Sequence, residues 1–132
     1  MSLDFDERGV SRDHAPVLVM RPGDGPSRSV LLAAYDGPKG EAFSALLEAH
    51  DMQGGGYSFA ALLAAACIDA GMELDDVAFD PEGDMLSVSF PDEARAERAA
   101  ILLRRMIDDP ERTKAMIGLA RTIELPEGVE FE

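Results

Sequence analysis

The spacing of apolar residues changes along the chain, and these changes divide it into predicted strands and helices. Residues 16–22 and 27–36 are short, largely apolar runs joined by PGDGPS, and this pattern is typical of a β-hairpin. Residues 30–34 are apolar without interruption, which predicts a central strand covered on both faces. Residues 75–90 contain two further predicted strands around the turn sequence DPEGD. The pattern therefore predicts two hairpins.

Four segments have apolar residues at the three- and four-residue spacing of a helix. They cover residues 37–52, 58–70, 91–109 and 110–123. Ser58 is the expected N-cap of the second helix and Gly71 its expected end. Asp109 followed by Pro110 is typical of the start of a helix, which separates the third helix from the fourth. The glycines at 54–56 are expected to form a joint between two helices, because glycine tolerates positive φ.

At the two ends of the chain the spacing of apolar residues is less regular. Residues 1–14 are polar and aperiodic, so they are predicted to be a loose N-terminal lead-in to a single domain over residues 15–132. Near the other end, Val129 and Phe131 are candidates for a short edge strand. The expected fold class is α+β, with an antiparallel sheet of four or more strands packed on one face by about four helices. A chain of 132 residues, 46% of them hydrophobic, is long enough to bury one core.

Charge narrows the choice of partners. The chain has 12 basic and 26 acidic residues and a net charge of −14, which makes nucleic acids and anionic membranes unfavourable partners. Residues 37–90 carry 10 acidic residues and one basic residue, Lys39, so their net charge is −9. The longest apolar segment is interrupted by Asp69 and is too short to span a membrane, and the N-terminus has no signal-peptide pattern. A cytoplasmic protein is expected.

Two segments match part of a ligand-binding motif, the phosphate loop or the EF-hand, but neither contains the rest of that motif. A phosphate loop follows a strand and ends in Gly-Lys-Ser/Thr, whereas a predicted helix precedes these glycines and no lysine follows them. The acidic run at 75–84 supplies hard oxygen ligands, but Gly83 is fourth from Asp80, and an EF-hand needs glycine at the sixth of twelve positions. A solvated hairpin turn is therefore expected there, with no metal and no cofactor.

Candidates for catalysis are few. Cys67 is the one cysteine, and its alanine-rich surroundings favour a buried, unreactive thiol. His14 lies in the predicted lead-in, and His50 ends a helix, where a cation complements the helix dipole. No serine lies in a Gly-x-Ser-x-Gly pattern. The sequence contains no catalytic constellation, so we expect a protein that is not an enzyme.

An acidic surface with neighbouring aromatic residues is typical of a protein that binds a cationic partner, because complementary potentials accelerate association. The alternative is that the charge serves only solubility. For two of the candidates, Tyr57 and Phe59, a core position is favoured over a position that faces the partner. The candidate partner-binding residues are Tyr57, Phe59, Asp75, Asp76, Asp80, Glu82 and Asp84.

Several segments together resemble a known family. In order and spacing, GGGYSFAALLAAA, VAFDPEGDMLSVSF, IDDPERTKAMIGLAR and the closing GVEFE resemble the immunity protein 51 family of bacterial polymorphic toxin systems, and FDPEGDM is the most specific part. The resemblance covers about residues 50–132. Two departures are that Phe59 stands where the family pattern has tryptophan, and that MLSVSF lacks the Cys or Ala and the Tyr usual after the methionine.

The resemblance implies an α+β domain that binds and neutralises a cognate toxin in the cytoplasm, without catalysis. The toxin typically comes from a neighbouring gene. Two alternatives stay open. One is an acidic accessory module for another basic protein. The other is a small enzyme that uses the carboxylates at 75–84, which would require a concave pocket with at least one buried carboxylate.

Overall fold

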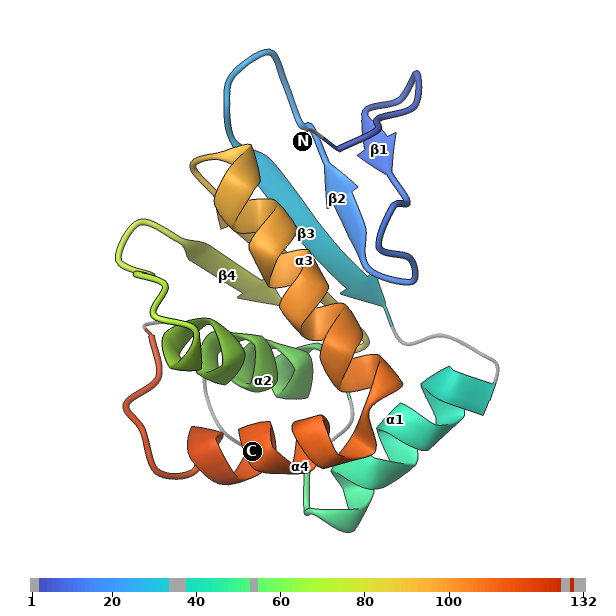
Figure 1. The fold of residues 1–132 in the computed structure, drawn as a ribbon, viewed down its shortest axis with the longest axis vertical. Helices are drawn as coiled ribbons and strands as arrows, with labels where there is room; N and C mark the ends of the chain where they lie inside the picture. Colours follow the sequence, from blue (N-terminus) through green and yellow to red (C-terminus); the bar gives the residue numbers. More distant parts are fainter. Residues whose placement is uncertain (1–2, 34–37, 53–54, 127–128, 130–132) are drawn as a thin grey trace.

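The computed structural model describes residues 3–33, 38–52, 55–126 and 129 (Figure 1). Within these ranges the chain forms four helices and a five-stranded antiparallel sheet, which confirms the predicted α+β class. The strands are β1 (Val10–Ser11), β2 (Leu18–Met20), β3 (Arg28–Ala33), β4 (Ala78–Pro81) and β5 (Met85–Phe90). The helices are α1 (Pro38–Ala49), α2 (Gly56–Asp69), α3 (Glu93–Asp108) and α4 (Pro110–Ala120).

The sheet has the order β1-β2-β3-β5-β4. Both predicted hairpins, β2–β3 and β4–β5, are present, and they join where β3 pairs with β5. At this junction Val30 lies opposite Val88, and both side chains are buried. The centre of the sheet is therefore built from strands that come from distant parts of the chain.

The N-terminal segment is more ordered than its sequence indicated. Val10 and Ser11 form β1 and pair with Met20 and Val19, inside the range predicted as a loose lead-in. Ser11 and Leu3 are also buried. A strand of two residues is too short to show alternation, so it left no periodic signal in the sequence.

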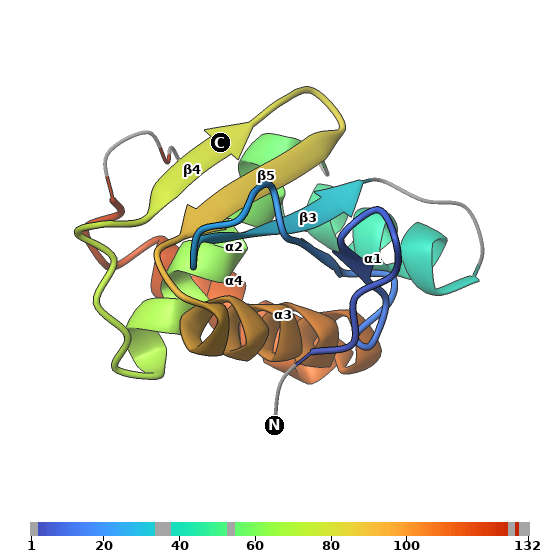
Figure 2. The ribbon, with the colours of Figure 1, turned by 90° about the horizontal axis from the view of Figure 1, so that it is seen from above.

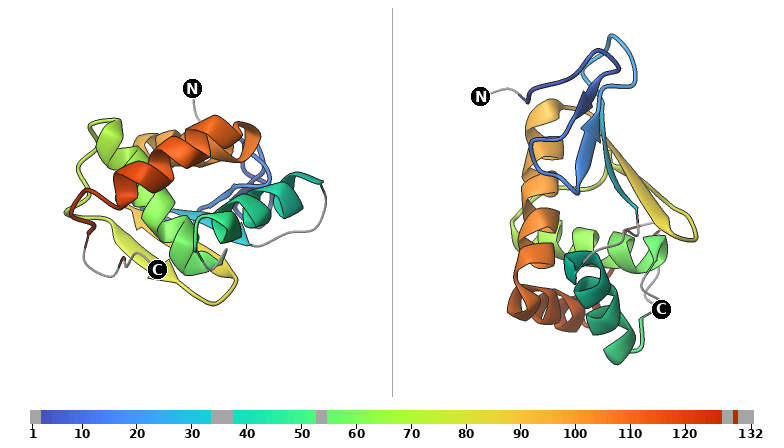
Figure 3. Two further views of the ribbon diagram at one scale, coloured as in Figure 1. Left: turned by 90° about the horizontal axis from the view of Figure 1, so that it is seen from below. Right: turned by 90° about the vertical axis from the view of Figure 1, so that its right-hand side faces the viewer.

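Helices cover one face of the sheet. Figure 2 shows α2 and α3 on the same side of β3 and β5, and Figure 3 shows α3 running along that side of the strands. Val30 and Leu32 of β3 point towards these helices and are buried, whereas Leu31 is half-buried and Ala33 is exposed. The prediction that β3 is covered on both faces is therefore wrong. An apolar run shows that a strand is central, but not that both of its faces are covered.

Helix α2 is the core helix of the domain. It is buried between the sheet and α4, and eleven of its fourteen residues are buried. A helix that is apolar on all sides suits such a position. It begins at Gly56, with Gly55 as its N-cap, so the prediction that Ser58 caps it is wrong. Its other end agrees with the sequence, because Gly71 follows Asp69 and Ala70 with φ +79°.

Helix caps elsewhere follow the sequence closely. The Asp92 carboxylate accepts a hydrogen bond from the Arg95 amide at 2.9 Å and caps α3. The Asp109 carboxylate accepts one from the Glu111 amide at 3.1 Å, with Pro110 in the first turn of α4. The predicted junction between the third and fourth helices is therefore confirmed. Of the predicted tail strand, Val129 is buried but is not in a strand, and Phe131 lies outside the described residues.

The glycines before α2 lie between two helices, as predicted, but Gly55 and Gly56 serve close packing rather than a positive φ. Gly55 has φ −116°, and a Cβ on it would overlap the carbonyl oxygen of Gly83. A Cβ on Gly56 would overlap the carbonyl oxygens of both Glu82 and Met85. The interpretation of these glycines as a joint that needs positive φ is corrected for Gly55 and Gly56, while Gly54 lies outside the described residues. They are small because the β4–β5 turn lies directly against the start of α2.

Candidate interaction surface

The contact between α2 and the β4–β5 turn creates an exposed acidic tip, which comprises Tyr57, Asp80, Glu82 and Asp84. The Gly56 amide donates a hydrogen bond to the Gly83 carbonyl oxygen at 3.3 Å, so the first turn of α2 is held against the hairpin. Tyr57 follows directly and is 38% exposed, and the three acidic residues are also exposed. An aromatic side chain and three carboxylates are therefore exposed where the start of α2 lies against the β4–β5 hairpin.

Phe59 does not belong to this surface. It is 1% exposed and stacks on Phe43 of α1, with ring centroids 5.7 Å apart and an angle of 24° between the ring planes. Two residues along a helix turn the side-chain direction by about 200°, so Tyr57 and Phe59 lie on opposite sides of α2. Phe59 is a core residue, and its place among the partner-binding candidates is corrected. The core position favoured for Tyr57 is wrong, because its side chain is 38% exposed, and Tyr57 stays a partner-binding candidate.

Asp76 is held by the protein itself. Its two carboxylate oxygens accept hydrogen bonds from both terminal nitrogens of Arg95, at 2.8 and 3.0 Å. The same arginine donates through Nε to Asp92 at 2.8 Å, which ties the segment before β4 to the start of α3. The side-chain hydrogen bond from Arg95 lowers the pKa of Asp76. A charge compensated in this way adds little attraction for a partner, which sets Asp76 apart from the other acidic candidates.

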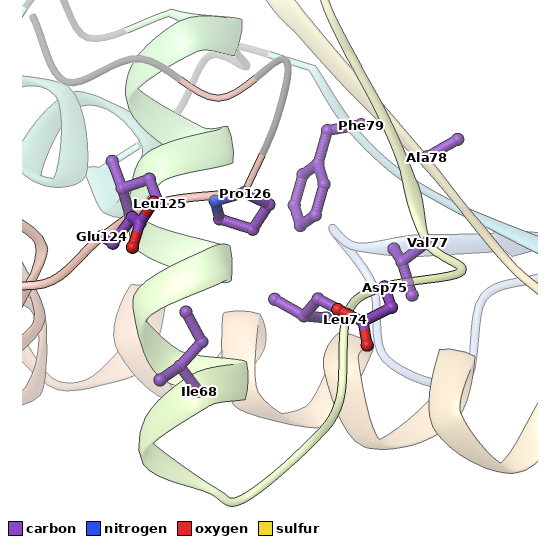
Figure 4. Close-up of a pocket in the computed structure, with 9 residues that line it drawn as sticks. All are labelled: Ile68, Leu74, Asp75, Val77, Ala78, Phe79, Glu124, Leu125 and Pro126. Carbon is purple, nitrogen blue, oxygen red and sulfur yellow. The ribbon is translucent and has the colours of Figure 1, made fainter.

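Asp75 lies beside a groove of about 700 Å³ (Figure 4). The groove lies between the last turn of α2, the segment that leads into β4, and residues 124–126. The side chains of Phe79 and Pro126 face one another across it, with Ile68 below them in the view of Figure 4. Its lining residues are Ile68, Leu74, Asp75, Val77, Ala78, Phe79, Glu124, Leu125 and Pro126.

The sequence pointed to Asp75 but not to the groove. Ile68 follows an alanine-rich segment that is otherwise buried, and its 36% exposure depends on how α2 sits in the fold. Residues 124–126 lie about fifty residues away along the chain from Ile68 and Phe79. No local pattern signals that such distant segments lie on one surface.

The acidic candidates lack the environment that the enzyme alternative required. Asp75, Asp76, Asp80, Glu82 and Asp84 are all exposed, so none of them is a desolvated carboxylate. Among the described residues, no three His, Cys, Asp or Glu side chains are grouped so that they could hold a metal ion. Cys67 is buried, and burial raises the pKa of its thiol to about 12. The acidic candidates therefore do not include the buried carboxylate that the enzyme alternative requires.

The histidines have structural contacts. Nε2 of His14 lies 3.1 Å from a carboxylate oxygen of Glu97, and Nδ1 of His50 lies 3.0 Å from the Leu46 carbonyl oxygen in α1.

For the part of the chain that the structure describes, no helix has the length and apolar character needed to cross a bilayer.

No family model matches the chain, and no curated protein or solved structure is significantly similar to it.

Proposed function

We propose that the protein is a bacterial immunity protein, which binds a cognate polymorphic toxin through its acidic surface and neutralises it in the cytoplasm. Two lines of support come together. The sequence over residues 50–132 resembles the immunity protein 51 family, and the α+β fold is of the class that this resemblance implies. The interaction is one of binding alone and requires no cofactor.

The observation that carries the proposal is a set of uncompensated carboxylates. Asp75, Asp80, Glu82 and Asp84 are exposed, and none of them makes an ion pair or side-chain hydrogen bond with another described residue. Asp76 is the contrasting case, because Arg95 compensates its charge. Uncompensated charge of one sign accelerates encounter with a partner of the opposite sign. It therefore favours a basic protein partner.

A nuclease toxin fits this charge pattern. Nucleases that bind a phosphate backbone need a basic cleft, and an acidic protein can occupy such a cleft in place of the phosphates. The −9 charge of residues 37–90 is concentrated in the segments that form the acidic tip and lead into the groove. In this mechanism the immunity protein blocks access of the nucleic acid to the cleft and does not take part in the catalytic step of the toxin.

Reversing the charge of this surface is expected to slow toxin binding. In Asp75→Lys with Asp80→Lys, we expect the association rate with the toxic domain to fall roughly tenfold or more at low salt, because electrostatic steering is lost. Stopped-flow fluorescence over a series of salt concentrations measures this rate. For the unchanged protein the rate falls steeply with added salt.

The matched control is Asp4→Lys with Glu7→Lys, which changes the net charge equally at two exposed positions near the N-terminus. We expect a much smaller decrease for this variant. Equal effects of the two variants would show that only net charge matters, and an affinity that does not depend on salt would contradict the acidic-surface mechanism.

A further inference from the structure

We infer that the groove beside β4 binds an extended segment of the partner protein in which apolar residues alternate with basic ones. The inference rests on the proposed function for the identity of that partner. The chemistry of the bound segment is argued from the groove itself, and it adds a second contact to the acidic tip.

Apolar side chains line much of the groove and form its floor, which we define as Ile68, Leu74, Phe79 and Leu125. Among the described residues, the exposed large hydrophobic side chains are Tyr57 (38% exposed) and Ile68 (36% exposed). Ile68 lies in this groove. Leu74, Phe79 and Leu125 are only half-buried beside it. A volume of about 700 Å³ falls within the range of about 300–1,000 Å³ that is usual for ligand sites. The floor can therefore accept apolar side chains.

Both charged residues that line the groove in the described part of the chain are acidic. Asp75 and Glu124 are exposed, and neither makes an ion pair or side-chain hydrogen bond with another described residue. Among the described residues, no basic side chain lines the groove. Two uncompensated carboxylates beside an apolar floor favour a segment that carries Lys or Arg between its apolar residues, because complementary charge selects the partner.

The backbone of β4 limits how the segment can lie. The Glu82 amide donates to the Met85 carbonyl oxygen at 2.7 Å, and bonded pairs alternate along an antiparallel ladder. Ala78 and Asp80 therefore turn their backbone groups towards β5, while Phe79 and Pro81 turn theirs towards the edge of the sheet. Within the described residues no strand pairs with this edge.

Only one residue of this edge offers both a donor and an acceptor. Pro81 has no N–H, and the Val77 amide already donates to the Leu74 carbonyl oxygen at 3.1 Å. A bound strand can thus pair with Phe79 but cannot continue as a regular ladder along β4. We therefore expect the side chains in the groove, rather than backbone pairing, to supply most of the affinity.

The test uses a fluorescein-labelled peptide of six residues that alternates leucine and lysine, titrated with the full-length protein and followed by fluorescence anisotropy. We expect saturable binding, and a loss of roughly tenfold or more in affinity for Asp75→Lys with Glu124→Lys. The matched control is Glu82→Lys with Asp84→Lys at the acidic tip, which changes the net charge equally and is expected to alter affinity less than threefold.

Two further measurements locate the peptide. Hydrogen exchange of the Phe79 amide is expected to slow on binding. A peptide that alternates leucine and glutamate is expected not to bind.

Equal losses in the two lysine variants would overturn the inference, because they would show attraction to net charge alone. Absence of peptide binding to the unchanged protein would overturn it as well. So would a dimer that forms in sedimentation experiments and dissociates in Ile68→Lys, because a second copy of the chain would then occupy the groove. Toxin neutralisation that persists in Asp75→Lys with Glu124→Lys would refute the groove contact and leave the proposed function standing. If the unchanged protein binds no toxic domain but does bind the peptide specifically, the proposed function would be refuted and the groove contact would stand.

Discussion

Gly56→Ala is expected to destabilise the fold by about 3 kcal/mol or more, because the new methyl group must displace two backbone carbonyls rather than a movable side chain. The oxygens are those of Glu82 and Met85 at the β4–β5 turn. Moving them would separate the turn from the start of α2, the helix that forms the core. A domain of this size has a free energy of unfolding of about 5–15 kcal/mol, so the loss is a large share of the total. Urea unfolding followed by circular dichroism measures it.

Gly118→Ala is the matched control in another helix. Gly118 lies in α4, and a Cβ there meets nothing within 4 Å. Alanine is a better helix former than glycine by up to about 1 kcal/mol, so this variant is expected to be as stable as the unchanged protein or more stable. A cost of less than about 1 kcal/mol for Gly56→Ala would contradict the close approach between α2 and the turn.

Phe59→Ala is expected to cost about 3–5 kcal/mol, as is usual for removing a buried aromatic side chain. Phe59 is among the largest fully buried residues and stacks on Phe43, so its loss leaves a cavity where α1 meets α2. Thermal unfolding and urea unfolding both report the change.

Tyr57→Ala, two residues earlier in the same helix, separates the core role from the surface role. Because Tyr57 is partly exposed, the free energy of unfolding is expected to change by less than about 1 kcal/mol. Toxin affinity, in contrast, is expected to fall, because Tyr57 belongs to the acidic tip and aromatic residues often supply much of the binding energy at interfaces. A large loss of stability in Tyr57→Ala and a small one in Phe59→Ala would reverse these assignments.

The features that the sequence predicted well are those that local chemistry determines. Asp109 and Pro110 start α4 because a carboxylate cap and a proline in the first turn act within a few residues. The β4–β5 hairpin follows from the turn sequence DPEGD between two apolar runs. Gly71 takes positive φ at the end of α2, and glycine suits this position because it has no Cβ, which is a local property of the residue itself.

The features that the sequence did not predict depend on contacts between distant segments. Gly55 and Gly56 are small because residues 82–85 approach them, and nothing near them in the chain reports this approach. The sequence does not distinguish Asp76 from the other acidic candidates, but Arg95 of α3 compensates its charge. The groove likewise depends on residues 124–126 lying beside α2 and β4. Composition supplied the acidic character of the candidate surface, whereas only tertiary structure distinguishes which carboxylates are uncompensated.

The most direct test of the proposal that this acidic surface neutralises a toxin is survival of bacteria that express a candidate toxic domain, taken from a gene that neighbours the gene for this protein. Cells that also express the unchanged protein are expected to grow, and the two proteins are expected to co-purify at low salt and separate at high salt. Cells that express Asp75→Lys with Asp80→Lys are expected to grow poorly, although that variant is expected to fold because both positions are exposed. Death of cells that contain the well-folded unchanged protein would contradict the immunity function and favour an acidic module for a different basic partner.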